Sequence, residues 1–160
     1  MTAYERTHWR DEALSERHRG YGLDAPMVDV DFLCLEYDTG KPVAIVEYKL
    51  GSPRPLDLEH SSYKAVRRLA DASKIPFAVV FYNSTVWVYT AFPANHWATE
   101  WFREGEELTE VGYVKRLYRL RGREAPPEVI RRCYEITPER AREAEAAKAA
   151  GMEVLIWPKI

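Results

Sequence analysis

Two apolar segments joined by a short polar turn constrain the fold of this chain most strongly. Residues 28–37 and 42–49 are rich in valine, leucine, isoleucine and tyrosine, and Asp38-Thr39-Gly40 separates them. β-Branched and aromatic residues on both sides of a turn that contains glycine predict an antiparallel β-hairpin. Both arms also carry charged residues, which are costly to bury in a strand unless an opposite charge pairs with them.

The segments after the hairpin predict a second strand that is reached through a helix. Residues 56–73 place apolar side chains at helical spacing, and residues 76–82 form an almost continuous apolar run that suits a central strand covered on both faces. A strand, a helix and a strand in this order predict a right-handed parallel crossover. The sequence therefore predicts an α/β fold with a mixed central sheet flanked by helices.

The remaining segments predict more helices around this sheet and two further strands. We expect helices over residues 4–19, 97–102, 109–121, 127–134 and 137–151, and strands over residues 85–90 and 152–157. A chain of 160 residues is large enough for one domain with a substantial core. We expect a single domain over residues 1–160, with a core in residues 1–90 and a helical extension with a final short strand in residues 91–160.

Composition and charge exclude some classes of protein. No apolar run is long enough for a membrane span and no secretory signal is visible, so we expect a cytoplasmic protein without membrane partners. Two cysteines without a Cys-x-x-Cys pair predict neither a disulfide framework nor a structural zinc site. The net charge is −2, but basic residues gather late in the chain. They form either a solvated helix face or a contact with nucleic-acid phosphates, through Lys115, Arg116, Arg119, Arg121 and Arg123.

Charged residues on the hairpin predict one chemical site. Side chains alternate along a strand, so Glu47 and Lys49 share one face, and Asp29 and Asp31 share one face of the preceding strand. With a turn near residues 39–40, Glu47 lies opposite Asp31 or its neighbour, and Lys49 lies near Asp29 or its neighbour. A slip of one residue would move the acids to the other face. The sequence thus predicts three carboxylates and one ammonium group at one end of the hairpin.

This set of groups predicts metal-dependent chemistry on a phosphate. Mg²⁺ takes oxygen ligands and is usually held by one or two carboxylates together with water and substrate phosphate. The ion polarises a phosphodiester and helps to generate hydroxide from water, and a lysine beside it orients the attacking water and stabilises negative charge. The candidate ligands are Asp31, Glu47, Asp29 and the backbone carbonyl of Tyr48, with Lys49 as the amine.

The arrangement of these residues along the chain is similar to that of a known group of enzymes. Asp29 or Asp31 on one arm, Glu47-x-Lys49 on the other, and a following helix and strand resemble the PD-(D/E)XK nuclease superfamily over about residues 4–82. The resemblance implies a restriction endonuclease-like core within residues 1–90. It implies Mg²⁺- or Mn²⁺-dependent hydrolysis of phosphodiester bonds, usually in DNA, with Asp31, Glu47 and Lys49 as catalytic residues.

The resemblance also raises secondary candidates and shows two departures. In many members the first helix contributes a further acid, and Glu12 and Glu16 are the candidates here, unless they form a solvated helix face. Pro26 stands three residues before Asp29, so the literal Pro-Asp pair is absent. The strand that usually precedes the aspartate strand must be short or displaced.

Several alternatives stay open at the level of the sequence. An endonuclease that cuts both strands often needs two sites, so a homodimer is a partner hypothesis beside DNA. The small size suggests a phage or mobile-element enzyme. The alternative from another class is a catalytically inactive nuclease-fold module that binds nucleic acid or a protein. RNA also stays open as a substrate, because no residue pattern here reads a 2′-hydroxyl.

Overall fold

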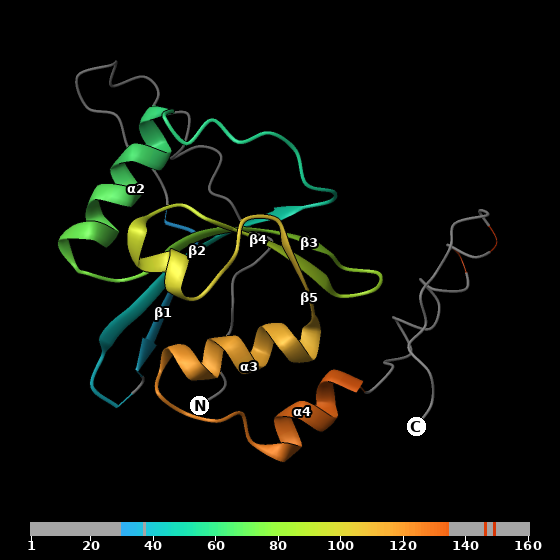
Figure 1. Ribbon diagram of the computed structural model, residues 1–160. Coiled ribbons are helices and arrows are strands. Elements are labelled where there is room, and N and C mark those ends of the chain that lie inside the picture. Colours follow the sequence, from blue (N-terminus) through green and yellow to red (C-terminus); the bar gives the residue numbers. More distant parts are fainter. Residues whose placement is uncertain (1–29, 37, 135–145, 147–148, 150–160) are drawn as a thin grey trace, which may run out of the picture.

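A mixed five-stranded sheet forms the centre of the protein (Figure 1). The computed structural model describes residues 30–36, 38–134, 146 and 149. The strands lie in the order β1-β2-β3-β4-β5, and β2 and β3 are parallel whereas the other neighbours are antiparallel. Their bounds are β1 (Phe32–Glu36), β2 (Lys41–Leu50), β3 (Phe77–Asn83), β4 (Val88–Pro93) and β5 (Glu106–Thr109). The expected α/β fold with a mixed sheet is confirmed.

Helices lie on both faces of this sheet. Figure 1 shows α2 (Ser61–Ala72) on one side and α3 (Glu110–Leu120) on the other, with α4 (Pro127–Tyr134) beyond α3. A 3-10 helix, η1 (His96–Glu100), connects β4 with β5. The helix α2 connects the two parallel strands, as the sequence predicts.

In the described part of the chain, no helix combines the length and the apolar character that a bilayer crossing requires.

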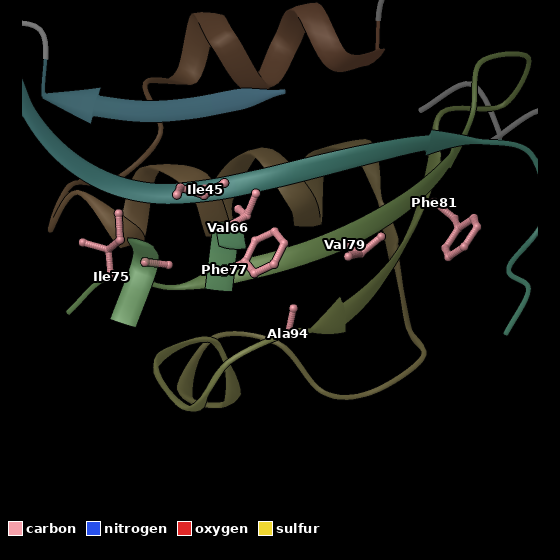
Figure 2. Packing of buried hydrophobic residues seen from close by; sticks show 8 residues of the cluster. Ile45, Val66, Ile75, Phe77, Val79, Phe81 and Ala94 are labelled. Carbon is pink, nitrogen blue, oxygen red and sulfur yellow. The ribbon is translucent and has the colours of Figure 1, made fainter. Parts of the chain in front are cut away.

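The sheet separates two apolar cores. The first, which we call the α2 core, is shown in Figure 2 and consists of Ile45, Val66, Ala70, Ile75, Phe77, Val79, Phe81 and Ala94. The second, the α3 core, consists of Val46, Ala78, Val80, Ala91, Phe102 and Tyr113. Successive residues of β2 and β3 point alternately into the two cores, which is the period of a strand. Because both faces are covered, the central strand is apolar throughout residues 77–81.

The β1–β2 hairpin forms where the sequence predicts it. Gly40 has a φ of 66°, and its N–H donates to the Glu36 carbonyl at 2.8 Å. Only glycine adopts such a conformation without steric cost, so this residue fixes the turn. The register pairs Phe32 with Val46, and a bulge follows Cys34. The Cys34 side chain is partly buried and packs against the α3 core.

The start of α2 differs from the expectation by several residues. The helix begins at Ser61 rather than at residue 56. The Asp57 side chain accepts a hydrogen bond from the Glu59 N–H at 3.1 Å, and the His60 side chain accepts from the Ser62 N–H. Side chains that cap backbone N–H groups in this way mark the boundary of a helix.

The turn between β3 and β4 is longer than expected, so β4 begins later in the sequence than predicted. β4 begins at Val88 rather than at residue 85, because Asn83 Oδ1 accepts from the Thr85 N–H at 2.9 Å and holds residues 84–87 in a turn. Trp87 closes this turn with a φ of 49°. A bulky residue rarely adopts a left-handed conformation, so the sequence did not predict that Trp87 would belong to the turn.

β5 is a strand that the sequence did not predict. It extends the sheet beyond residue 90, into the region where a helical extension was expected. Glu106 at its start accepts from the Arg103 N–H and forms an ion pair with Arg116 of α3. The predicted helices over residues 4–19 and 137–151 and the predicted strand over residues 152–157 lie outside the described residues, apart from Ala146 and Ala149, which are helical.

Asn95 connects β3, β4 and η1 at the edge of the α2 core. Its Oδ1 accepts hydrogen bonds from the Phe77 N–H at 2.9 Å and the Ala98 N–H at 3.0 Å. Its Nδ2 donates to Asp71 Oδ1 and to the Ile75 carbonyl, both at 2.9 Å. The amide therefore uses both donors and accepts two bonds, although the residue is only 8% exposed.

We expect the Asn95→Ala substitution to lower the free energy of unfolding by about 2–3 kcal/mol, because buried backbone groups would lose their partners. Urea unfolding followed by circular dichroism measures the change. Asn83→Ala is the matched control, since Asn83 caps an exposed turn where water replaces the lost bond, and it should cost about 1 kcal/mol or less. Equal losses for the two variants would contradict the role given to Asn95.

Candidate active site

The Glu47–Lys49 pair lies in the C-terminal half of β2, on the face that α2 covers. Ile45, Glu47 and Lys49 alternate along the strand onto one side, and Ile45 belongs to the α2 core. Lys49 Nζ lies 2.6 Å from Glu47 Oε1, and the two side chains are 30% and 18% exposed. The pair therefore sits at the rim of the core, where it is partly shielded from water and still open to a ligand.

Asp31 occupies the corresponding position on the other arm of the hairpin. The Phe32 ring contacts the Tyr48 ring edge-on, with 4.9 Å between centroids, so Phe32 points toward the α3 face. Asp31 directly precedes β1, and its charge acts on Lys49, which places it near the charged pair. Phe32 pairs with Val46, so extending the hairpin register by one residue beyond β1 would bring Asp31 opposite Glu47. The structure thus brings Asp31 near the Glu47–Lys49 pair, in one of the two registers that the sequence left open.

The electrostatics of this face keep Lys49 charged. The hydrogen bond from Lys49 to Glu47 raises the pKa of the lysine most; partial burial opposes the rise, and the Glu47 charge, Tyr63 and Asp31 add to it. Lys49 Nζ also lies 6.0 Å from the centroid of the Tyr63 ring in α2. A raised pKa means that the amine is protonated at neutral pH. It is therefore suited to stabilise negative charge and not to accept a proton.

The donor set fits a magnesium-like ion rather than zinc. Two carboxylates, Asp31 and Glu47, lie at opposed positions across the hairpin, and Mg²⁺ or Mn²⁺ needs only one or two carboxylates together with water and phosphate oxygens. Among the described residues, no group of three or more His, Cys, Asp or Glu side chains could hold a metal ion. A structural zinc ion takes four protein ligands, which the described residues of this face do not supply.

The other predicted ligands either lie outside the described residues or have a side chain that points away from the charged pair. Asp29 and the candidate acids Glu12 and Glu16 lie outside the described residues. The Tyr48 side chain points to the α3 face, where its hydroxyl lies 2.6 Å from the hydroxyl of Tyr113. Only the backbone carbonyl of Tyr48 therefore remains as a ligand from this residue.

Tyr48 anchors β2 from the side opposite the charged pair. It lies between Glu47 and Lys49 in the sequence, and its ring makes edge contacts with the rings of Tyr82 and Tyr113 at 6.0 Å and 6.2 Å. Tyr113 is 2% exposed, and burial strongly raises the pKa of its hydroxyl, so it stays protonated and available for a hydrogen bond. The strand that carries the charged pair is thus fixed to α3.

Comparisons with known proteins identify no relative. The chain matches no known protein family, no curated protein and no solved structure.

The basic residues expected to contact nucleic acid lie on the other side of the sheet. They are on or just after α3, which packs against the α3 core: Lys115, Arg116, Arg119, Arg121 and Arg123. The Glu47–Lys49 pair lies on the α2 face. The structure therefore does not bring the basic segment together with the candidate site residues Asp31 and Glu47.

Several of these basic residues already have partners. Arg116 forms two hydrogen bonds with the Glu106 carboxylate, at 2.9 Å and 3.0 Å, which lower the pKa of Glu106. Arg123 pairs with Glu36 at 2.7 Å, and Arg119 lies 3.7 Å from Glu124. Lys115 is exposed. A contact between this segment and phosphate stays a prediction, and Arg116 and Arg123 would have to give up structural ion pairs to make it.

Sequence reasoning missed Arg54, which lies on the same sheet face as the charged pair. Its guanidinium carbon is 5.3 Å from the centroid of the Phe81 ring, and Phe81 is the register partner of Lys49 on β3. In the sequence, Pro53-Arg54-Pro55 places a cation between two prolines, a pattern that by itself indicates only the end of a strand. The face that carries Glu47 therefore holds a second positive charge.

Proposed function

We propose that this protein is a metal-dependent nuclease that hydrolyses phosphodiester bonds, with DNA as the expected substrate. The observation that carries the proposal is the Glu47–Lys49 pair, at 2.6 Å, on the same sheet face as the opposed Asp31. An acid pair beside a charged amine, at the rim of a core, provides a cation site next to a group that stabilises anionic charge. The parallel β2–α2–β3 unit that holds the pair agrees with the fold that the resemblance implies.

Each residue has a distinct role in this proposal. Asp31 and Glu47 would hold the cation, and Glu47 binds Lys49 through Oε1, which leaves Oε2 for that purpose. A bound Mg²⁺ or Mn²⁺ supplies a Lewis acid that polarises the phosphodiester. Lys49 donates hydrogen bonds to a phosphate oxygen and stabilises the charge that develops there. Its raised pKa keeps it in the protonated form that this role requires.

The test of this proposal is a cleavage assay with a defined panel of substrates and cations. Purified protein is incubated with supercoiled plasmid, a branched DNA junction, single-stranded DNA and RNA, each with Mg²⁺, Mn²⁺ or EDTA. We expect cleavage of DNA with either cation and none with EDTA. Conversion of the closed plasmid identifies an endonuclease, and linear product without a nicked intermediate would support a homodimer that cuts both strands.

The alternative class gives a different result in the same assay. A catalytically inactive nuclease-fold module would bind one of the substrates in a gel-shift experiment and cleave none of them with any cation. That outcome would refute the proposed hydrolysis, as would cleavage that EDTA leaves unchanged.

A further inference from the structure

Arg54 lies on the segment that connects β2 with α2, and local constraints hold this segment in place. Proline fixes its own φ and restricts the residue before it to extended conformations, so Pro55 restricts Arg54 and Pro53 restricts Ser52. The Gly51 N–H donates to the Tyr82 carbonyl at 2.9 Å, which fixes the start of the segment against β3. The position of Arg54 is therefore set by the backbone as well as by its side chain.

The Arg54 side chain reaches the same sheet face as Lys49. Its guanidinium lies over the ring of Phe81, which is 1% exposed and belongs to the α2 core. Phe81 and Lys49 are paired on neighbouring strands, and paired residues of a sheet point to the same side. Arg54 and Lys49 thus place two cations on adjacent parts of one surface.

The guanidinium of Arg54 has no carboxylate partner among the residues that the structure describes. Within the described ranges, Arg54 forms no ion pair and no hydrogen bond, whereas Arg67 pairs with Glu59 and Arg116 pairs with Glu106. A contact with a ring face does not use the N–H donors of the guanidinium. These donors form a planar fork that matches two oxygens of a phosphate.

We infer that Arg54 binds a backbone phosphate that flanks the phosphodiester held at Lys49, so that the substrate is gripped at two neighbouring phosphates on the α2 face. The inference rests on the proposed function, because it takes nucleic acid as the ligand. It also assigns substrate binding to the face that carries Glu47 and Lys49, rather than to the basic segment beyond α3.

Binding measurements test this inference independently of cleavage. Fluorescence anisotropy of a labelled DNA duplex is recorded with Ca²⁺ as the cation over a range of salt concentrations, and a gel verifies that the duplex stays intact. We expect Arg54→Ala to raise the Kd about tenfold and to reduce the slope of log K against log salt by about one. Arg54→Lys should keep the slope but bind more weakly than the wild type, since it lacks the fork.

Arg68→Ala is the matched control for charge. Arg68 is exposed on α2, and its removal changes the net charge by the same amount, so we expect Kd and slope to match those of the wild type. Thermal unfolding verifies that each variant is folded. If Arg54→Ala does not fold, Arg54→Gln and Arg54→Lys supply the comparison.

The outcomes separate the two proposals. If the wild type cleaves DNA but Arg54→Ala and Arg68→Ala have the same Kd and slope, the inference about Arg54 is wrong and the proposed function stands. If Arg54→Ala selectively weakens binding but no cation supports cleavage, the phosphate site stands and the proposed function fails. If the wild type does not bind the duplex, the inference is also wrong.

Discussion

Lys49→Ala is expected to reduce the rate of DNA cleavage by about 10²–10³-fold, which is the usual loss when one preorganised group that stabilises a transition state is removed. The lysine side chain is 30% exposed, so its ion pair with Glu47 contributes little to folding and the variant should remain folded. Single-turnover cleavage of plasmid, with the cation saturating, measures the effect on the chemical step rather than on binding.

Companion variants show whether the loss comes from the charge itself. Glu47→Gln keeps the shape of the side chain and removes its charge, and it should weaken the response to Mg²⁺. Lys64→Ala is the control, because Lys64 is 43% exposed and pairs with Glu59 on the outer side of α2; its rate should match that of the wild type. A rate for Lys49→Ala equal to that of Lys64→Ala would refute the role of Lys49.

The pH dependence of cleavage adds a second readout for the same residue. The hydrogen bond to Glu47 raises the pKa of Lys49 above its ordinary value, so the protonated form persists until the pH rises through this elevated pKa. We therefore expect no inflection from Lys49 in the rate between about pH 6 and pH 9. An inflection in this window that disappears in Lys49→Arg would instead identify the lysine as a base.

Phe77→Ala is expected to lower the free energy of unfolding by about 3–5 kcal/mol, the usual cost of removing a large aromatic side chain from a packed core. Phe77 is 0% exposed and lies in the α2 core, at the first position of the central strand. A loss of this size is a large fraction of the about 5–15 kcal/mol that stabilises a typical domain.

Urea unfolding gives the comparison directly. The midpoint should fall while the m-value stays unchanged, because the surface exposed on unfolding is almost the same. Leu69→Ala is the control, since Leu69 is 52% exposed on α2 and its removal should change stability by about 0.5 kcal/mol or less. Similar midpoints for the two variants would show that the α2 core does not hold β3 in place.

Much of the fold could be predicted because periodicity and turn residues agree with the tertiary structure. The alternation of residues 42–49, the glycine at position 40 and the continuous apolar run of residues 76–82 each report burial directly. β5 could not be predicted in this way, because its residues Glu106–Thr109 include two glutamates. Glu106 is accommodated by Arg116, a partner on another element, and such a contact is not visible in a local pattern.

The candidate site could also be predicted only where it depends on local sequence patterns. The shared face of Glu47 and Lys49 follows from strand alternation alone, and the position of Asp31 follows from the hairpin register. The contact of Arg54 with Phe81 could not be predicted, because it depends on how the segment after β2 returns across the sheet. The basic segment shows the converse problem: a cluster of charges in the sequence does not reveal which face it occupies or which carboxylates it already binds.

The attachment of Tyr48 to α3 has a consequence for the ion selectivity of the proposed cation site. Glu47 and Lys49 are two residues apart on one strand that is fixed from behind, so a shift in the packing around Tyr113 would displace both groups together and preserve their spacing. Their separation from Asp31 is set instead by the hairpin, whose bulge after Cys34 alters its bend and twist. Selectivity for ionic radius would therefore evolve through substitutions in β1 and its turn rather than in the strand that carries the amine.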